Sequence, residues 1–160
     1  MIVIIVLIAV IIGLFVASFF SKRRFGILGM GLAAGAIISP IWGETAGYII
    51  SSTGFVPEGP LVNVIAYSTI ILIPALLFMF HGYVYKSIVG RIVGSLLFTL
   101  LAVAFLSGPI GAALTFSGPV ASVYNWLVAN HEMVVGIGVA IAVADLLLSK
   151  PAQKSEKKRR

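Results

Sequence analysis

Residues 1–26 read MIVIIVLIAVIIGLFVASFFSKRRFG, and this stretch decides the fold. Residues 1–20 carry no charge, and a helix needs about 20 such residues to cross roughly 30 Å of bilayer hydrocarbon. Three basic residues, Lys22, Arg23 and Arg24, follow at once. Because basic segments beside spans stay in the cytoplasm, the stretch predicts a helix that crosses a membrane from outside to inside.

A cleaved signal peptide is the alternative interpretation of residues 1–20. Such a peptide has a basic segment followed by an apolar region of about 7–15 residues. In this chain no basic residue precedes the apolar run, and the run is longer than that. We therefore expect residues 1–20 to be retained as a membrane anchor.

The rest of the chain shares this apolar character. Of the 160 residues, 60% are hydrophobic and only 10% are charged, whereas a soluble domain carries about a quarter charged residues. The composition predicts an all-α, polytopic integral membrane helical bundle. The apolar runs predict five transmembrane helices at about residues 1–20, 27–50, 61–80, 92–107 and 131–149. Residues 119–130 are too short to span, and we expect a short outer interfacial or re-entrant helix there, with an ordinary loop as the alternative.

The positions of the basic residues predict the orientation. All 11 Lys and Arg residues fall in three clusters, after the first, third and fifth apolar runs. The clusters lie at residues 22–24, at Lys86 and Arg91, and in the segment 150–160. This distribution places the N-terminus outside, the C-terminus in the cytoplasm, and an odd number of spans between them.

The residues that would support catalysis or metal binding are sparse. The chain has no cysteine, and His81 and His131 are expected on opposite faces of the membrane. The sequence HEMVV at residues 131–135 lacks the second histidine of a HExxH zinc motif. We therefore predict no enzyme activity, no catalytic residue, no cofactor and no metal. Because the positive charge lies at helix ends rather than over one face, we also predict no nucleic-acid partner.

Small residues four positions apart let helix backbones approach closely in lipid. Packing within one subunit is the favoured role of these pairs, with a dimer seam as the alternative. The chain has three such pairs, Gly31 with Gly35, Gly43 with Gly47, and Gly90 with Gly94. Pro40 and Pro74 lie inside apolar runs and predict helix kinks.

Glu44, in SPIWGETAGYII at residues 39–50, and Asp145 are the acidic residues inside apolar runs. Ionisable residues at membrane depth are candidate functional sites, here for an ion, a proton or another polar group. Glu44 is expected near the outer boundary, either facing water or in a cleft between helices. Asp145 is expected near the cytoplasmic edge, in headgroup water or paired with a basic residue, so the two cannot form one dyad.

The basic clusters predict contact with anionic lipid headgroups at the cytoplasmic face, where each charge contributes about 1 kcal/mol. For the basic tail, residues 150–160, the alternative is that it only determines the orientation in the membrane and binds no partner. The residues expected at the headgroups are Lys22, Arg23, Arg24, Lys157, Lys158, Arg159 and Arg160.

Several short motifs occur in a characteristic order. A basic, glycine-containing turn, SKRRFGILGMG, follows the first span at residues 21–31. An outer loop with prolines, GFVPEGP, covers residues 54–60, and GRIVGSLLF at residues 90–98 opens the fourth span. In this layout the chain resembles the colicin V production protein family of bacterial inner-membrane proteins over about residues 1–115. The resemblance implies a non-enzymatic protein of the bacterial cytoplasmic membrane, linked to export or envelope maintenance, and assigns no active residue.

The sequence therefore favours a scaffold or accessory subunit, as a homo-oligomer or part of a larger membrane complex. One alternative is a small oligomeric ion channel or transporter, which Glu44, Asp145, Pro40 and Pro74 would serve. A holin-like pore former is a third hypothesis.

Overall fold

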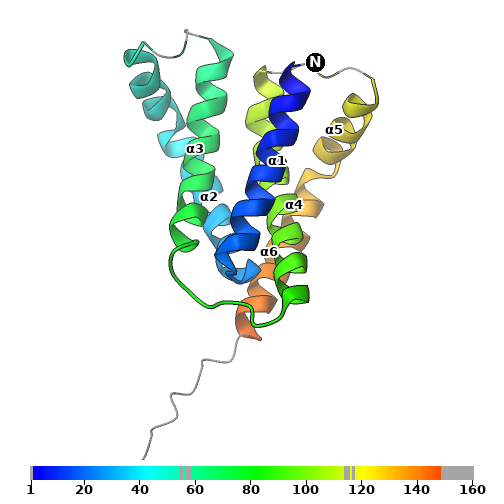
Figure 1. Ribbon diagram of the computed structural model, residues 1–160. Coiled ribbons are helices and arrows are strands. Elements are labelled where there is room, and N and C mark those ends of the chain that lie inside the picture. The colour runs from blue at the N-terminus through cyan, green and yellow to red at the C-terminus, as the bar shows by residue number, and fades with distance from the viewer. Residues whose placement is uncertain (1, 55, 57–58, 114–115, 117, 149–160) are drawn as a thin grey trace, which may run out of the picture.

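The computed structural model describes residues 2–54, 56, 59–113, 116 and 118–148, and the regular structure in this part of the chain is helical. Here the chain forms six helices: α1 (Ile2–Ser21), α2 (Phe25–Ser52), α3 (Pro60–Phe78), α4 (Ile88–Ala113), α5 (Pro119–Ala129) and α6 (His131–Leu147). Figure 1 shows them as a bundle.

Three of these helices are long and apolar enough to cross a membrane. They are α2 with 28 residues, α3 with 19 and α4 with 26. A fourth crossing is formed if α5 and α6 act as one broken span, because the pair passes the same test with a bend of 71° between its halves. α1 has 20 residues, of which Leu7–Ser21 form a shorter apolar helix by the same test. The chain is thus a helical protein compatible with an integral membrane location.

The long helices alternate in direction, so the chain ends and connections gather at two ends of the bundle (Figure 1). The turn after α1, the segment from α3 to α4 and the end of α6 lie at one end. We call it the basic end, since all five Lys and Arg residues that the structure describes, at positions 22–24, 86 and 91, lie there. The end of α2 and the start of α3 lie at the opposite, distal end.

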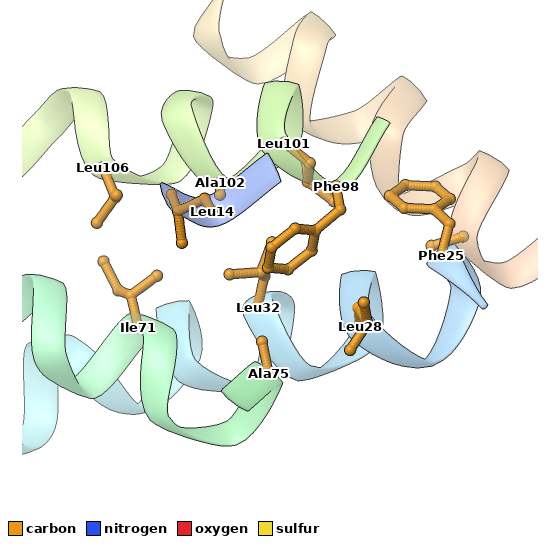
Figure 2. Packing of buried hydrophobic residues seen from close by; sticks show 11 residues of the cluster. Leu14, Phe25, Leu28, Leu32, Ile71, Ala75, Phe98, Leu101, Ala102 and Leu106 are labelled. Carbon is orange, nitrogen blue, oxygen red and sulfur yellow. The ribbon is translucent and has the colours of Figure 1, made fainter. Parts of the chain in front are cut away.

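The core lies around α4, which contacts each of the other five helices described. Phe98 of α4 and Leu32 of α2 are fully buried and lie beside each other in Figure 2. Ile71 of α3 and Leu14 of α1 join the same cluster. α2 and α3 pack against each other from Gly31 and Ala75 to Gly47 and Asn63, whereas α1 contacts only α4 among the described helices.

The outward faces of the bundle are also apolar. Ile12 of α1, Ile37 of α2 and Leu77 of α3 are 57%, 73% and 63% exposed. Soluble monomers rarely expose contiguous apolar patches of more than a few hundred Å². Lipid would solvate these faces, which is why a chain with so few charges forms a bundle of this kind.

Five helices begin and end within two residues of the expected bounds, and α4 does not. It was expected at residues 92–107, ending at Ser107-Gly108-Pro109, but runs from Ile88 to Ala113. Pro109 removes one hydrogen bond and leaves the rest of the ladder intact, as prolines inside membrane helices commonly do. The added residues include Gly111, which lies against the Tyr124 side chain of α5.

Candidate functional site

At the basic end, the turn between α1 and α2 pairs with the segment between α3 and α4. The backbone N–H of Arg24 donates to the carbonyl of Tyr83 at 3.1 Å, and the N–H of Tyr85 donates to the carbonyl of Lys22 at 2.8 Å. Lys22 has a φ of 60°, in the left-handed region that few non-glycine residues adopt. This pairing directs Arg23 and Arg24 toward the protein.

The guanidinium of Arg23 caps the C-terminal end of α3. Its Nε donates to the carbonyl of Met79 at 3.0 Å, and its other nitrogens donate to the carbonyls of Phe80 and Gly82. Met79 is the C-cap of α3, and the last carbonyls of a helix lack partners within the helix and carry partial negative charge. Phe80 and Gly82 lie in the connection that follows. Arg23, which we expected to contact lipid headgroups, thus donates to backbone carbonyls of the protein.

Asp145 of α6 holds the start of α2. Its Oδ2 accepts a hydrogen bond from the backbone N–H of Gly26 at 2.9 Å, and its Oδ1 lies 3.5 Å from a guanidinium nitrogen of Arg24. The two side chains are only 17% and 23% exposed. A carboxylate at a helix N-terminus is favoured because it complements the helix dipole.

Tyr85 completes this group. Its hydroxyl accepts a hydrogen bond from the N–H of Phe25 at 3.2 Å, and the guanidinium of Arg24 lies 5.3 Å from its ring centre. Burial raises the pKa of Tyr85 above 10, with the charge of Asp145 acting in the same direction; the Phe25 hydrogen bond and Arg24 oppose them. We call Arg23, Arg24, Tyr85 and Asp145 the basic-end clamp.

The clamp joins three segments that are distant in sequence, namely the α1–α2 turn, the α3–α4 connection and α6. Its charges pair with each other or bind backbone groups at helix ends, so it holds the helices together at the basic end. The sequence analysis missed Tyr85 and the two glycines Gly26 and Gly29, which lie against Ala142 of α6. The sequence did contain one signal for this contact. Gly26 lies at the expected start of a helix, four residues after Lys22, where the basic run begins.

The two glycine pairs of α2 line its contact with α3. A Cβ atom at Gly31 would lie 2.8 Å from the Cα of Ala75, and one at Gly43 would clash with the ring of Tyr67. Gly47 lies opposite Asn63, with ordinary contact distances for an added Cβ. In this structure, the seam is therefore a contact within one chain.

Gly35 occupies the tightest part of the seam. A Cβ there would clash with the carbonyl oxygens of Ile70 and Ile71. Pro74 has no N–H to give to the Ile70 carbonyl, so this oxygen is left to face the Gly35 backbone. In α2, the Ser39 hydroxyl donates at 3.0 Å to the Ala36 carbonyl, which Pro40 leaves without its usual donor.

Gly90 and Gly94 do not meet another helix as their spacing predicted. Both lie against the ring of Tyr85, in the connection that precedes α4. A Cβ at Gly90 would be 3.0 Å from that ring. The pair thus makes room for the clamp.

Glu44 lies at the other end of the bundle. It is exposed on α2 and borders an open groove of about 560 Å³, which we call the distal groove. Within the described residues, Glu44 has no hydrogen bond or ion pair. The groove is lined by Glu44, Gly47, Tyr48 and Ser51 of α2, and by Gly59, Val62 and Asn63 at the start of α3. The structure does not bring Glu44 and Asp145 together.

The expected short helix at residues 119–130 corresponds to α5, and a smaller cavity of about 410 Å³ lies where it meets α6. Asn130, His131 and Glu132 line this cavity. At the bend, the Trp126 carbonyl accepts both the backbone N–H of Asn130 at 3.1 Å and its side-chain amide at 2.8 Å.

The tail residues expected at lipid headgroups, Lys157, Lys158, Arg159 and Arg160, lie outside the described residues. In the part of the chain that the structure describes, no three His, Cys, Asp or Glu side chains group as metal ligands.

Comparison of the chain with the models of known protein families, with curated proteins and with solved structures finds no match.

Proposed function

We propose that this chain is a non-enzymatic membrane protein that acts as a scaffold or accessory subunit. In this proposal it has five spans, with α1 as the first and the α5–α6 pair as the last. Its N-terminus is outside and its basic end faces the cytoplasm of a bacterial cell. The layout that resembles the colicin V production protein family supports a link to export or envelope maintenance.

The observation that carries the proposal is the use of the membrane-edge charges in the basic-end clamp. Asp145 and Arg24 form an ion pair, and Arg23 donates hydrogen bonds to the backbone carbonyls that follow α3. A transporter needs ionisable groups that exchange partners along a path. Fixed, mutually satisfied charges suit a rigid platform for other membrane proteins.

The test is isolation of the tagged full chain from its native membrane in a mild detergent, followed by mass measurement. A scaffold is expected in a complex well above the 16.9 kDa of a single chain. Asp145→Ala should release the chain from that complex, while Glu132→Gln, an exposed change away from the clamp, should not. A wild-type protein that is monomeric under all conditions would contradict the scaffold proposal.

A small channel or transporter is the second candidate, and the position of Glu44 favours it. A carboxylate in a groove with no protein partner is available to a cation or proton. The test is ion and proton flux in proteoliposomes. Flux in the wild type that disappears in a stable Glu44→Gln variant would replace the scaffold proposal, whereas no flux in either is the outcome expected of a scaffold.

A further inference from the structure

A stripe of exposed side chains runs along the face of α2 that points away from the bundle. The residues of α2 that pack on α3, such as Gly31 and Gly35, lie on the other side of the helix. Successive members of the stripe are four and three residues apart in alternation, which is the spacing of a seam where a second helix packs alongside. We call these residues the outer stripe, and all of them are exposed: Met30, Ala34, Ile37, Ile41, Glu44 and Tyr48.

Glu44 places a carboxylate in the outer stripe, below the membrane surface. α3 has 19 residues and so rises about 28 Å, close to the roughly 30 Å of bilayer hydrocarbon. Gly43 faces Tyr67 and Gly47 faces Asn63, and these partners are the eighth and fourth residues of α3. In a bilayer that α3 spans, Glu44 is therefore level with a point roughly 5–10 Å inside the hydrocarbon boundary.

A charged group at this depth needs either water or a neutralising partner. Glu44 has no hydrogen bond or ion pair within the described residues. The open distal groove beside it, of about 560 Å³, gives water access to the carboxylate when the outer stripe is uncovered. A helix packed on the stripe would exclude that water, so it has to bring a positive charge of its own, because burial of an unpaired charge is very costly.

The positive charge has to come from a different protein. The sequence has no Lys or Arg between residues 25 and 85 or between residues 92 and 149. The Lys and Arg residues that the structure describes lie at the basic end, far from Glu44. A second copy in the same orientation would bring its own Glu44 to the same depth, and like charges brought together at an interface are unfavourable.

We propose that the outer stripe is the docking site for a transmembrane helix of another protein, and that a lysine or arginine of that helix pairs with Glu44. Apolar side chains of the partner helix pack on Ile37 and Ile41, which are 73% and 71% exposed in the free chain. This inference rests on the scaffold proposal, since it states which surface and which charge the scaffold offers to its partner.

The test is disulfide cross-linking to a designed helix in bacterial membranes, because the chain has no cysteine of its own. The full chain carries Ile41→Cys, one turn from Glu44. The designed helix is rich in leucine, with one lysine about five residues from its outer end and one cysteine a turn further in. We expect about tenfold more cross-linked product with this helix than with one that has leucine in place of lysine, the ratio given by about 1.4 kcal/mol of ion pairing.

Variants of the chain separate the ion pair from packing alone. Glu44→Gln should reduce cross-linking of the lysine helix to the level of the leucine helix. Glu44→Lys should favour a designed helix with glutamate in place of the lysine. The matched control is Glu132→Gln, an exposed acid outside the outer stripe, which should keep the preference for lysine.

Three results would overturn the proposal: equal cross-linking of the lysine and leucine helices, a lysine preference that survives in Glu44→Gln, or no cross-linking of a lysine helix that is inserted in the membrane. The scaffold proposal fails separately. A chain that is monomeric in its native membrane but prefers the lysine helix would contradict the scaffold and support the docking site. A chain in a large native complex that shows no lysine preference would support the scaffold and remove this docking site.

Discussion

The carboxylate of Asp145 accepts a hydrogen bond from the backbone N–H of Gly26 across 119 positions of sequence, at 2.9 Å. The bond joins the last turn of α6 to the first turn of α2. Beside it, Gly26 leaves space for the backbone of α6, since a Cβ at this position would lie 2.5 Å from the Ala142 carbonyl. The close approach of the two helices and the hydrogen bond between them thus depend on the same residue.

Replacement of Asp145 by alanine should destabilise the bundle by about 1–3 kcal/mol, the cost of leaving a partly buried donor without its acceptor. Arg24 would also lose its ionic partner. Asp145→Asn keeps an acceptor oxygen and loses only the charge, so its effect should be smaller. Thermal unfolding in detergent measures both variants, and equal stability of the alanine variant and the wild type would show that the clamp contributes nothing.

Arg23→Lys should weaken the end of α3 although the charge is conserved. A lysine ammonium cannot reproduce the planar arrangement by which Arg23 reaches several carbonyls at once. We expect a loss of about 1–3 kcal/mol, since hydrogen bonds to charged groups are of that order. Lys86→Gln, which removes an exposed charge at the same end, is the control and should melt like the wild type.

Gly35→Ala should destabilise the α2–α3 pair by about 1–3 kcal/mol, as overpacking does. The new methyl group would meet the carbonyls of Ile70 and Ile71, and backbone cannot move aside as a flexible side chain can. Gly31→Leu should act in the same direction. The control is Gly13→Ala on α1, where a Cβ would meet nothing within 4 Å. A drop in melting temperature for Gly13→Ala as large as that for Gly35→Ala would refute this account.

Ionisation of Tyr85 should lower the free energy of unfolding in strong alkali. Its pKa is raised in the folded protein, so the folded state binds the phenolic proton more tightly than the unfolded state. The resulting stabilisation is complete below about pH 10, the ordinary pKa of tyrosine, and is lost as the pH rises through the folded-state value. Melting curves of wild type and Tyr85→Phe between pH 9 and 11.5 test this, because the variant should lack that part of the decline.

The orientation can be tested by labelling, since the chain has no cysteine of its own. Ser52→Cys should react with an impermeant thiol reagent added to intact cells, because residues 51–62 are expected outside. Ser155→Cys in the basic tail should not react until the membrane is opened. Labelling of both positions, or of the tail alone, would be incompatible with five spans and a cytoplasmic C-terminus.

The all-helical architecture was predicted correctly, because a long apolar run can satisfy all its backbone hydrogen bonds within itself only as a helix. The prediction failed at the end of α4, where a proline was expected to stop a helix whose remaining hydrogen bonds are sufficient. It also placed Asp145 near the basic residues without naming its partners. Arg24 and Gly26 could not be identified, because contacts between distant segments depend on how the helices cross.

The role expected of Gly90 and Gly94 illustrates the same limit. Two glycines four residues apart indicate that a helix has a face without side chains. The spacing does not indicate which group packs on that face, and here it is the ring of Tyr85. The predicted headgroup role of Arg23 rested on its charge alone. Arg23 donates to backbone carbonyls that follow α3, and the sequence around residue 23 does not indicate that these carbonyls lie nearby.

The single partner of α1 has a consequence for synthesis in the cell. Of the described helices α1 is made before the others, and residues 22–87 separate it from α4, the one described helix that it contacts. At about 5–20 residues per second, that interval lasts several seconds. During this time α2 and α3 are already adjacent and can pair, while Ser18, only 2% exposed in the finished bundle, has no helix to cover it. Of the described helices, the earliest in the chain therefore waits longest for its first packing partner.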